Sequence, residues 1–241
     1  MAGKKKINNV MDLYGLYESV KRTDSKCGEK IFVCIGGGCL ASGSLKVKEA
    51  FETALKKHGL EKNISVVGTG CLGPCARGPV AMVVKDNVFY QEVKPEDAEE
   101  IVFNHIVGKK PVERLAWKKD ADGSAAFTLK DIEFFNRQTK VVLGRCGKID
   151  PCSIEAYIGV EGYQAFAKVL TKFSPDNVIE EMKKSGLRGR GGAGFPTWMK
   201  WSFAKKSVND TKYILCNGDE GDPGAFMDRS VLEGDPHSVI E

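Results

Sequence analysis

The sequence predicts an α/β protein in two parts, of which the first is a small sheet flanked by helices. Short apolar runs of strand length alternate with amphipathic segments of helix length over the first 108 residues, and glycine or proline separates most of them. Beyond about residue 126 the pattern changes to helices around one glycine-rich loop. A chain of 241 residues is long enough for one large domain or two small ones.

The first part reads as a β-α-β unit followed by a β-β-α unit. The expected elements are a helix over 8–22, a strand over 30–36, a helix over 42–59, a strand over 64–70, a hairpin over 80–93 and a helix over 94–108. We expect Ser42 or Ser44 to cap the second helix and Gly59 to end it, while the hairpin turns at Asp86-Asn87. This order is typical of a thioredoxin-like sheet with helices on its faces.

The second part follows a charged stretch. We predict an N-terminal helix or tail over 1–24, a first domain over 25–108, a linker over 109–125 and a second, incomplete domain over 126–241. The second domain is expected to contain helices near 153–171 and 175–186, a strand over 212–217 and the acidic loop "GDEGDPGAFMDR".

Composition argues against several classes of protein. The net charge is only +4, and lysines alternate with acids, which suits solvated faces better than a nucleic-acid surface. No apolar run approaches the roughly 18 residues of a membrane span, and the N-terminal residues lack the apolar core of a secretory signal. We therefore expect a cytoplasmic protein, in whose reducing environment cysteines serve as metal ligands and not as disulfides.

Four of the eight cysteines form two pairs, each placed just after a predicted strand. Cys34 and Cys39 lie in "VCIGGGCLASG", and Cys71 and Cys75 lie in "TGCLGPCARGP". Glycine-rich backbone can approach inorganic sulfide closely and offer N–H donors to it, which favours an iron–sulfur cluster. Structural zinc and buried free thiols are the alternatives, although neither pair has the two-residue gap common at zinc sites.

The remaining cysteines and histidines do not form a second constellation. The isolated cysteines are Cys27, Cys146, Cys152 and Cys216, and the histidines are His58, His105 and His237. Cys216 is expected in the core at a strand end, and Cys146 could be a ligand that the spacing does not reveal. The histidines are too scattered for a metal site or a hydrolytic triad, so we predict surface or helix-end positions for them.

The cysteine spacing on this β-α-β frame resembles the thioredoxin-like [2Fe–2S] ferredoxins. The resemblance covers about residues 28–107, and the spacing differs from that of plant-type ferredoxins, where three cysteines lie together. It implies that Cys34, Cys39, Cys71 and Cys75 ligate one [2Fe–2S] cluster.

The stretch "LRGRGGAGFPTWMKW" at 187–201 carries the second motif. Gly189, Gly191 and Gly194 match the dinucleotide fingerprint, but a helix and not a strand is predicted before them, so an ordinary Rossmann turn is not expected. The stretch also holds aromatic and basic residues: Phe195, Trp198, Trp201, Arg190 and Lys200. Such neighbours suit a ligand with both a phosphate and a flat ring.

Residues 150–241 resemble the FMN-bearing, NADH-oxidising subunit of respiratory complex I. The family motifs GRGGAGFPTGxKW and CNADEGEPGTFKDR match here with small departures, notably Trp198 and Gly218. The resemblance implies a Rossmann-like FMN-binding domain in which FMN, and no side chain, transfers the hydride. It assigns Gly189, Arg190, Gly191, Gly192, Lys200, Asn217, Asp219 and Glu220 to FMN, and Phe195, Phe203 and Glu220 to NADH. A carboxylate near the ribose, here Glu220, favours NADH over NADPH.

The order of the two domains resembles the flavoprotein (beta) subunit of multimeric, electron-bifurcating [FeFe]-hydrogenases and the equivalent subunit of NAD-dependent formate dehydrogenases. This implies an NADH-linked oxidoreductase subunit whose partners include a small [2Fe–2S] subunit of such a complex. The family continues beyond the position of Glu241 into a [4Fe–4S] region, so we expect a fragment that is inactive alone and binds FMN weakly. The alternative is an electron carrier in which the [2Fe–2S] domain alone is active.

Overall fold

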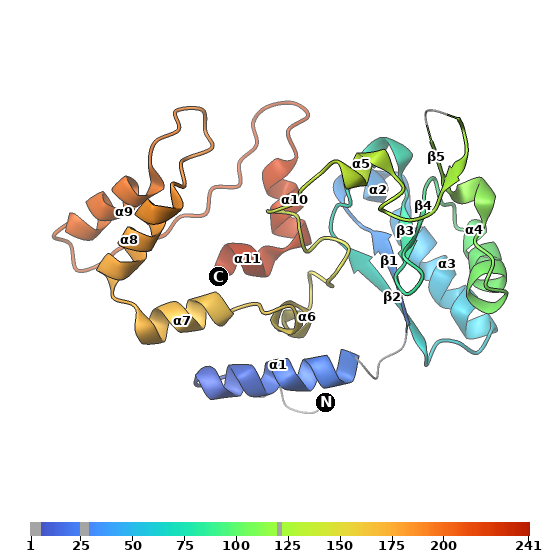
Figure 1. Cartoon of the computed structure of the whole chain (residues 1–241), viewed down its shortest axis with the longest axis horizontal. Helices are drawn as coiled ribbons and strands as arrows, with labels where there is room; N and C mark the ends of the chain where they lie inside the picture. Colours follow the sequence, from blue (N-terminus) through green and yellow to red (C-terminus); the bar gives the residue numbers. More distant parts are fainter. Residues whose placement is uncertain (1–5, 25–28, 120–121) are drawn as a thin grey trace. The chain divides into compact units, whose positions relative to one another are not determined.

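The computed structural model describes residues 6–24, 29–119 and 122–241 (Figure 1). The chain divides into two compact units. The first comprises residues 1–162 and 219–240, and the second comprises residues 163–218 together with Glu241. The fold of each unit is therefore taken separately below.

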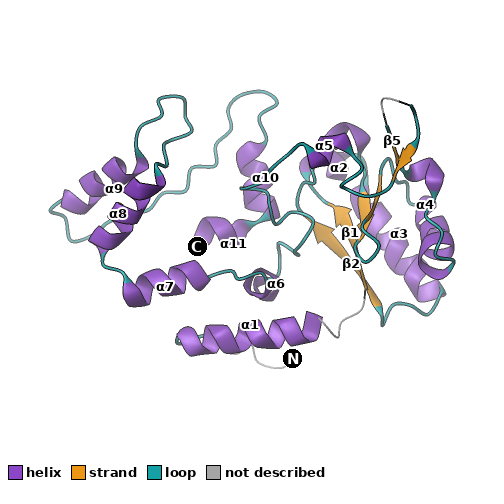
Figure 2. Cartoon of the chain, in the orientation of Figure 1, coloured by secondary structure: helices purple, strands orange, loops and turns teal. Residues whose placement is uncertain are grey.

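A four-stranded mixed sheet is the centre of the first unit (Figure 2). Its strands are β1 (Glu29–Cys34), β2 (Ile64–Thr69), β3 (Ala81–Val83) and β4 (Val88–Tyr90). They lie in the order β2-β1-β3-β4, with β1 parallel to β2 and the other two pairs antiparallel. This topology confirms the predicted α/β class and the thioredoxin-like order.

Helices cover one face of this sheet. They are α3 (Ser44–Lys57), α4 (Asp97–Glu100) and the π-helical segment η2 (Ile101–Val107) that continues α4. Their apolar side chains pack with those of alternate strand residues such as Ile31, Val33 and Tyr90 in one buried cluster. Strand residues point alternately to the two faces, so Phe89 lies in a separate cluster on the opposite face.

The opposite face is covered by residues that we predicted to be a linker and by those that follow. Trp117, Ala126 and Phe135 pack in the cluster of Phe89 on this face, and β5 (Trp117–Lys118) pairs with β6 (Ala125–Ala126). Val112 and Leu115 instead join the cluster on the helix-covered face. The N–H of Phe89 donates to the carbonyl of Phe127 at 2.7 Å, so this segment also protects the exposed edge of β4. The described residues of the predicted linker, 109–119 and 122–125, therefore include side chains that pack against the sheet, with Val112 and Leu115 on the helix-covered face and Trp117 on the opposite face.

The predicted helix end and hairpin turn are confirmed by the structure, whereas one predicted helix cap is not. Gly59 has a φ of +66° and ends α3 as predicted, and Asn87 has a φ of +53° in the hairpin turn between β3 and β4. The prediction of Ser42 or Ser44 as the cap of α3 was wrong. Gly43, with a φ of +87°, precedes the helix, and the Ser42 hydroxyl instead donates to the carbonyl of Gly38. The short helix α2 (Gly37–Ala41) makes that carbonyl available.

His105 was predicted at the surface or at a helix end, and it lies in the last turn of η2 but is not at the surface. His105 falls on the inward side of η2 and is 2% exposed. Its Nδ1 lies 2.9 Å from the Tyr90 hydroxyl, which accepts the N–H of Val112, and its Nε2 lies 3.1 Å from Asp86. Burial lowers the pKa of His105 and raises that of Tyr90 to about 12. The polar chain gives the buried imidazole a partner on each side.

The remaining helices lie outside the sheet. In the first unit they are α1 (Val10–Asp24), the short α5 (Glu133–Asn136), α6 (Ile154–Gly159), α10 (Met227–Gly234) and α11 (Pro236–Ile240); in the second they are α7 (Gln164–Lys172), α8 (Pro175–Ser185) and α9 (Thr197–Lys206). The single helix predicted near 153–171 is divided, because Glu161 and Tyr163 take φ values of +69° and +62° between α6 and α7. Helix α8 follows its prediction, with a capping box at Ser174 and Gly186 at its end.

The strand predicted over 212–217 does not form. Tyr213, Ile214 and Leu215 are 81%, 100% and 87% exposed, and no strand among the described residues pairs with this segment. A strand without a hydrogen-bonding neighbour is unstable, which explains the difference. The same exposure places Cys216 at the surface and not in the core. No helix in the described part of the chain has the length and apolarity to cross a membrane.

Candidate iron–sulfur and flavin sites

The fold brings the two cysteine pairs to one edge of the sheet. Cys34 is the last residue of β1 and pairs in register with Thr69, the last residue of β2. Because these neighbouring strands are parallel, the turns that follow them leave the same edge. Cys39 lies in α2. Cys71 lies in the loop after β2, and Cys75 begins the short 3-10 helix η1 (Cys75–Arg77) that follows it. Cys39 is thus held by a short helix, whereas the sequence predicted a loop.

The four thiols interact as one group. The sulfurs of Cys71 and Cys75 are 3.8 Å apart, and Cys34 hydrogen-bonds to both Cys39 and Cys71. The bond to Cys39 raises the pKa of Cys34 to about 11, and the same bond lowers the pKa of Cys39. The pKa of Cys71 is raised, chiefly by its bond to Cys34, while burial raises that of Cys75. The pKa at which one of these cysteines becomes a thiolate therefore depends on whether its neighbours are protonated.

Three glycines allow the two ligand loops to approach this closely. A Cβ atom on Gly36 would lie 2.9 Å from the Cβ of Cys71, and one on Gly38 would lie 3.1 Å from that of Cys75. A Cβ on Gly78 would lie 2.8 Å from the sulfur of Cys39. The bare backbone fits a cluster that needs close contact on several sides.

The donor set fits a [2Fe–2S] cluster, which takes four cysteine thiolates, two on each iron. Among the described residues, no group of three or more His, Cys, Asp or Glu side chains surrounds a single metal-ion position. The assignment of the cluster to these four residues stays a prediction that the geometry supports.

Residues beyond the sheet domain contact the second ligand loop, and the sequence did not reveal them. The Thr69 hydroxyl donates to the carbonyl of Ile149 at 3.0 Å and accepts the N–H of Gly147 at 2.8 Å. The buried sulfur of Cys146 lies where a Cβ on Gly70 would come within 2.7 Å of it. Burial raises the pKa of Cys146 to about 11, as expected for a packed thiol. Cys146 thus lies beside the ligand loop without belonging to it.

The glycine-rich loop connects α8 to α9 in the second unit. Arg188 and Pro196 form an isolated antiparallel bridge, and the N–H of Gly189 donates to the carbonyl of Phe195 at 2.9 Å. The preceding element is a helix, as predicted, so the loop is not a Rossmann strand-to-helix turn. The N–H of Gly189 is occupied in this hairpin, which leaves phosphate binding to other backbone groups of the loop.

The other predicted residues of this loop are arranged around open space. Nothing lies within 4 Å of a Cβ built on Gly191 or Gly192, and the Nζ of Lys200 lies 3.6 Å from one built on Gly189. The rings of Phe195 and Phe203 are 6.4 Å apart between centroids and tilted by 43°. Arg190 is exposed. Two basic side chains and two rings beside an accessible loop fit a phosphorylated ring ligand.

The acidic motif has a structural role that the sequence did not predict. Asn217 belongs to the second unit, whereas Asp219 and Glu220 belong to the first. The Glu220 carboxylate accepts the N–H of Asp228 at 2.7 Å and that of Arg229 at 3.0 Å. The bond from Arg229 has the larger effect, and both bonds lower the pKa of Glu220. Glu220 therefore caps the start of α10. Its role toward a nucleotide stays a prediction.

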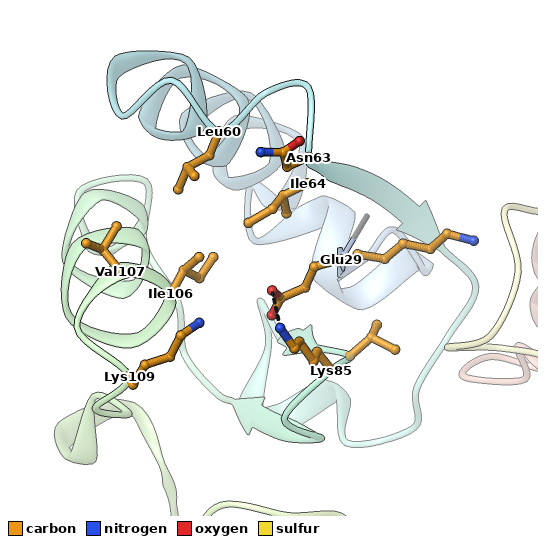
Figure 3. A pocket seen from close by; sticks show the side chains of 10 residues that line it. Glu29, Leu60, Asn63, Ile64, Lys85, Ile106, Val107 and Lys109 are labelled. Atoms are coloured by element: carbon orange, nitrogen blue, oxygen red, sulfur yellow. Dashed lines mark ion pairs between the residues drawn. The ribbon is translucent and has the colours of Figure 1, made fainter. Parts of the chain in front are cut away.

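A pocket of about 840 Å³ opens at the far end of β1 from the cysteines (Figure 3). Glu29, the first residue of β1, lies there opposite Lys85, with 4.0 Å between carboxylate and ammonium. Apolar side chains such as Leu60 and Ile106 complete the lining. None of the predicted ligand or cofactor residues lines this pocket.

Two segments of the chain match known family models. Residues 3–105 match the family model of the thioredoxin-like [2Fe–2S] ferredoxins. Residues 182–241 match the model of the Nuo51 FMN-binding domain. Each of the two segments is thus similar to one family model. The predicted resemblance is thereby confirmed for each part, with the four cysteines in one segment and the glycine-rich loop in the other.

Curated relatives of the chain are named as subunits of a hydrogenase and of NADH-quinone oxidoreductases. The chain is 57% identical over 105 residues to the NADP-reducing hydrogenase subunit HndC of Solidesulfovibrio fructosivorans. The aligned region covers 44% of this chain and 21% of that protein. It is 52% identical over 88 residues to an NADH-quinone oxidoreductase subunit of Rhizobium meliloti, which covers 36% of this chain and 21% of that protein. The chain thus spans about a fifth of the length of these relatives.

Two solved structures are also similar. The thioredoxin-like [2Fe–2S] ferredoxin from Aquifex aeolicus is 36% identical, with a TM-score of 0.36 over 39% of this chain and 99% of that one. The NAD⁺-reducing [NiFe]-hydrogenase in its air-oxidised state is 21% identical, with a TM-score of 0.33 over 93% of this chain and 38% of that one.

Proposed function

We propose that this chain is the electron-transfer part of an NADH-linked flavin iron–sulfur oxidoreductase subunit, of the kind found in multisubunit hydrogenases and in complex I. The observation that carries the proposal is the convergence of four thiols at the carboxyl ends of β1 and β2. The FMN-binding family match of residues 182–241 in the same chain supports the flavin part. The relatives' names supply the two classes of complex.

Cys34, Cys39, Cys71 and Cys75 would hold the [2Fe–2S] cluster, and Gly36, Gly38 and Gly78 keep the backbone close around it. Lys200 and Arg190 would offset the phosphate charge of FMN, and Phe195 and Phe203 would present ring faces to the nucleotide. When bound, FMN supplies two-electron hydride acceptance and one-electron release, while the cluster supplies one-electron transfer. The chain's own residues bind and orient these groups.

The partners and the nucleotide are also part of the proposal. NAD(H) is the expected donor or acceptor, and a small [2Fe–2S] subunit, a hydrogenase or formate dehydrogenase subunit and a [4Fe–4S] cluster are expected in the assembled enzyme. One relative is named NADP-reducing and another an NADH-quinone oxidoreductase, so both nucleotides belong in the test. A cytoplasmic location fits the free state of the cysteines in the described residues.

The test is anaerobic reduction of the reconstituted 241-residue chain, followed by the visible absorbance of the cluster. Since the chain alone is expected to be inactive and to bind FMN weakly, we expect NADH to reduce the cluster only when FMN is added in excess. The flavin is required because the hydride must be divided into single electrons. The same measurement is repeated with NADPH as the electron donor in place of NADH. Lys200→Met should slow the FMN-dependent reduction, since Lys200 lies beside the loop, whereas the exposed Lys206→Met at the end of the same helix should not.

A second candidate function is a [2Fe–2S] electron carrier without flavin activity. One observation favours it: all four cysteines lie in the first unit, whereas the glycine-rich loop lies in the second. If dithionite reduces the cluster while NADH with FMN does not, the carrier function holds and the flavin function fails. A colourless chain that holds one zinc would contradict both.

A further inference from the structure

Lys140 reaches into the second ligand loop from outside the ferredoxin segment. Its Nζ donates to the carbonyl of Leu72 at 2.5 Å, and Leu72 lies between the ligands Cys71 and Cys75. The same Nζ lies 3.7 Å from a Cβ built on Gly73. The side chain of Lys140 is only partly exposed, so its charge lies in an environment of reduced dielectric.

Neighbouring aromatic rings fix this position. Phe134 lies 3.0 Å from a Cβ built on Gly73, and the ring centroid of Phe135 lies 5.2 Å from the Lys140 ammonium. In the described residues no carboxylate forms a salt bridge with Lys140. Burial lowers the pKa of Lys140, while the nearby thiols of Cys71, Cys146 and Cys34 act in the opposite direction. The ammonium therefore lies beside the second ligand loop, bonded to the Leu72 carbonyl and without a carboxylate partner among the described residues.

We propose that Lys140 raises the reduction potential of the [2Fe–2S] cluster. This inference rests on the proposed function, because it requires the cluster. Reduction adds one electron from the donor to the cluster and makes its net charge more negative by one, with no proton transferred. A fixed positive charge beside the second ligand loop stabilises that reduced form more than the oxidised form.

Lys140 lies beyond the segment that matches the ferredoxin family. The ferredoxin family match ends at residue 105, so the residue that adjusts the cluster comes from the segment leading toward the FMN-binding match. Thr69, Gly147 and Ile149 hold that segment against the sheet through two hydrogen bonds. The downstream segment would thus adjust a cluster bound upstream.

The experiment is an EPR-monitored redox titration of the full chain with dithionite, on four variants. Lys140→Met removes the charge and the hydrogen bond, Lys140→Gln removes the charge and keeps a donor, and Lys140→Arg keeps the charge. Lys130→Met is the matched control, since Lys130 is exposed in the same region. At the wild-type midpoint, we expect the ratio of reduced to oxidised cluster to fall about tenfold in the Met and Gln variants, a shift of about 59 mV. The Arg and Lys130 variants should stay close to wild type.

The outcomes separate the possible failures. Wild-type potentials in both neutral Lys140 variants, with normal iron content, would overturn the inference and leave the proposed function intact. A lowered potential in the Met variant alone would also overturn it, because the hydrogen bond and not the charge would then be responsible. Loss of iron in every neutral variant would assign Lys140 a structural role instead. A wild-type chain without the [2Fe–2S] signature would overturn the proposed function itself.

Discussion

Replacing Cys34 with serine is expected to abolish cluster binding and to destabilise the first unit by several kcal/mol. Cys34 is 2% exposed, ends the central strand β1, and hydrogen-bonds to the thiols of both Cys39 and Cys71. A hydroxyl is a poor ligand for iron in a sulfur-rich site, and the binding free energy of such a centre is also folding free energy. Iron should fall from about two per chain to near zero. Metal analysis and urea unfolding measure the two effects.

Cys152→Ser is the matched control for this change. Cys152 is exposed, and the N–H of its backbone, which the substitution leaves in place, donates to Asp150. We expect its iron content and unfolding midpoint to match those of the wild type. Retention of about two irons by the Cys34→Ser chain would show that Cys34 is not a ligand.

Replacing Gly36 with alanine is expected to separate the two ligand loops. The new Cβ would lie 2.9 Å from the Cβ and 3.1 Å from the Cα of Cys71, and a backbone atom cannot give way as a flexible side chain can. Such overpacking typically costs about 1–3 kcal/mol. We therefore expect a lower urea midpoint together with a weaker cluster absorbance per chain.

Gly15→Ala provides the control of opposite sign. Gly15 lies inside α1, where nothing is within 4 Å of a built Cβ, so alanine gains helix propensity without a clash. The expected stabilisation is at most about 1 kcal/mol, with unchanged cluster content. If Gly36→Ala were as stable as Gly15→Ala, the close contact between the two ligand loops would not exist in solution.

The sheet and the cysteine site could be predicted from the sequence because their signals are local. The apolar runs 30–36 and 64–70 contain the strands β1 and β2, and one cysteine pair lies at or just beyond the end of each strand. Since parallel strands share their carboxyl ends at one edge, the convergence of Cys34 and Cys71 follows from topology alone. The left-handed Gly59 and Asn87 also follow from local chemistry.

Features that depend on distant contacts could not be predicted in this way. The burial of His105 requires Tyr90 and Asp86 on another element, and the contact of Lys140 with Leu72 joins residues 68 positions apart. Glu220 acts on the N–H groups of a helix that begins several residues later. No periodicity or spacing records such pairs, because tertiary packing alone creates them.

The strand expected over 212–217 failed for a related reason. Its apolar pattern is correct for a strand, but hydrogen bonds to a neighbouring strand are what stabilise one, and Ile214 is fully exposed without such a neighbour among the described residues. A pattern therefore predicts a strand only on the condition that a partner lies beside it.

The most direct test of the central claim is Mössbauer spectroscopy, with iron and sulfide analysis, on the anaerobically isolated chain. The convergence of Cys34, Cys39, Cys71 and Cys75 predicts about two irons and about two inorganic sulfides per chain, with each iron in a four-sulfur environment. A chain that holds about one zinc and no sulfide would contradict the assignment.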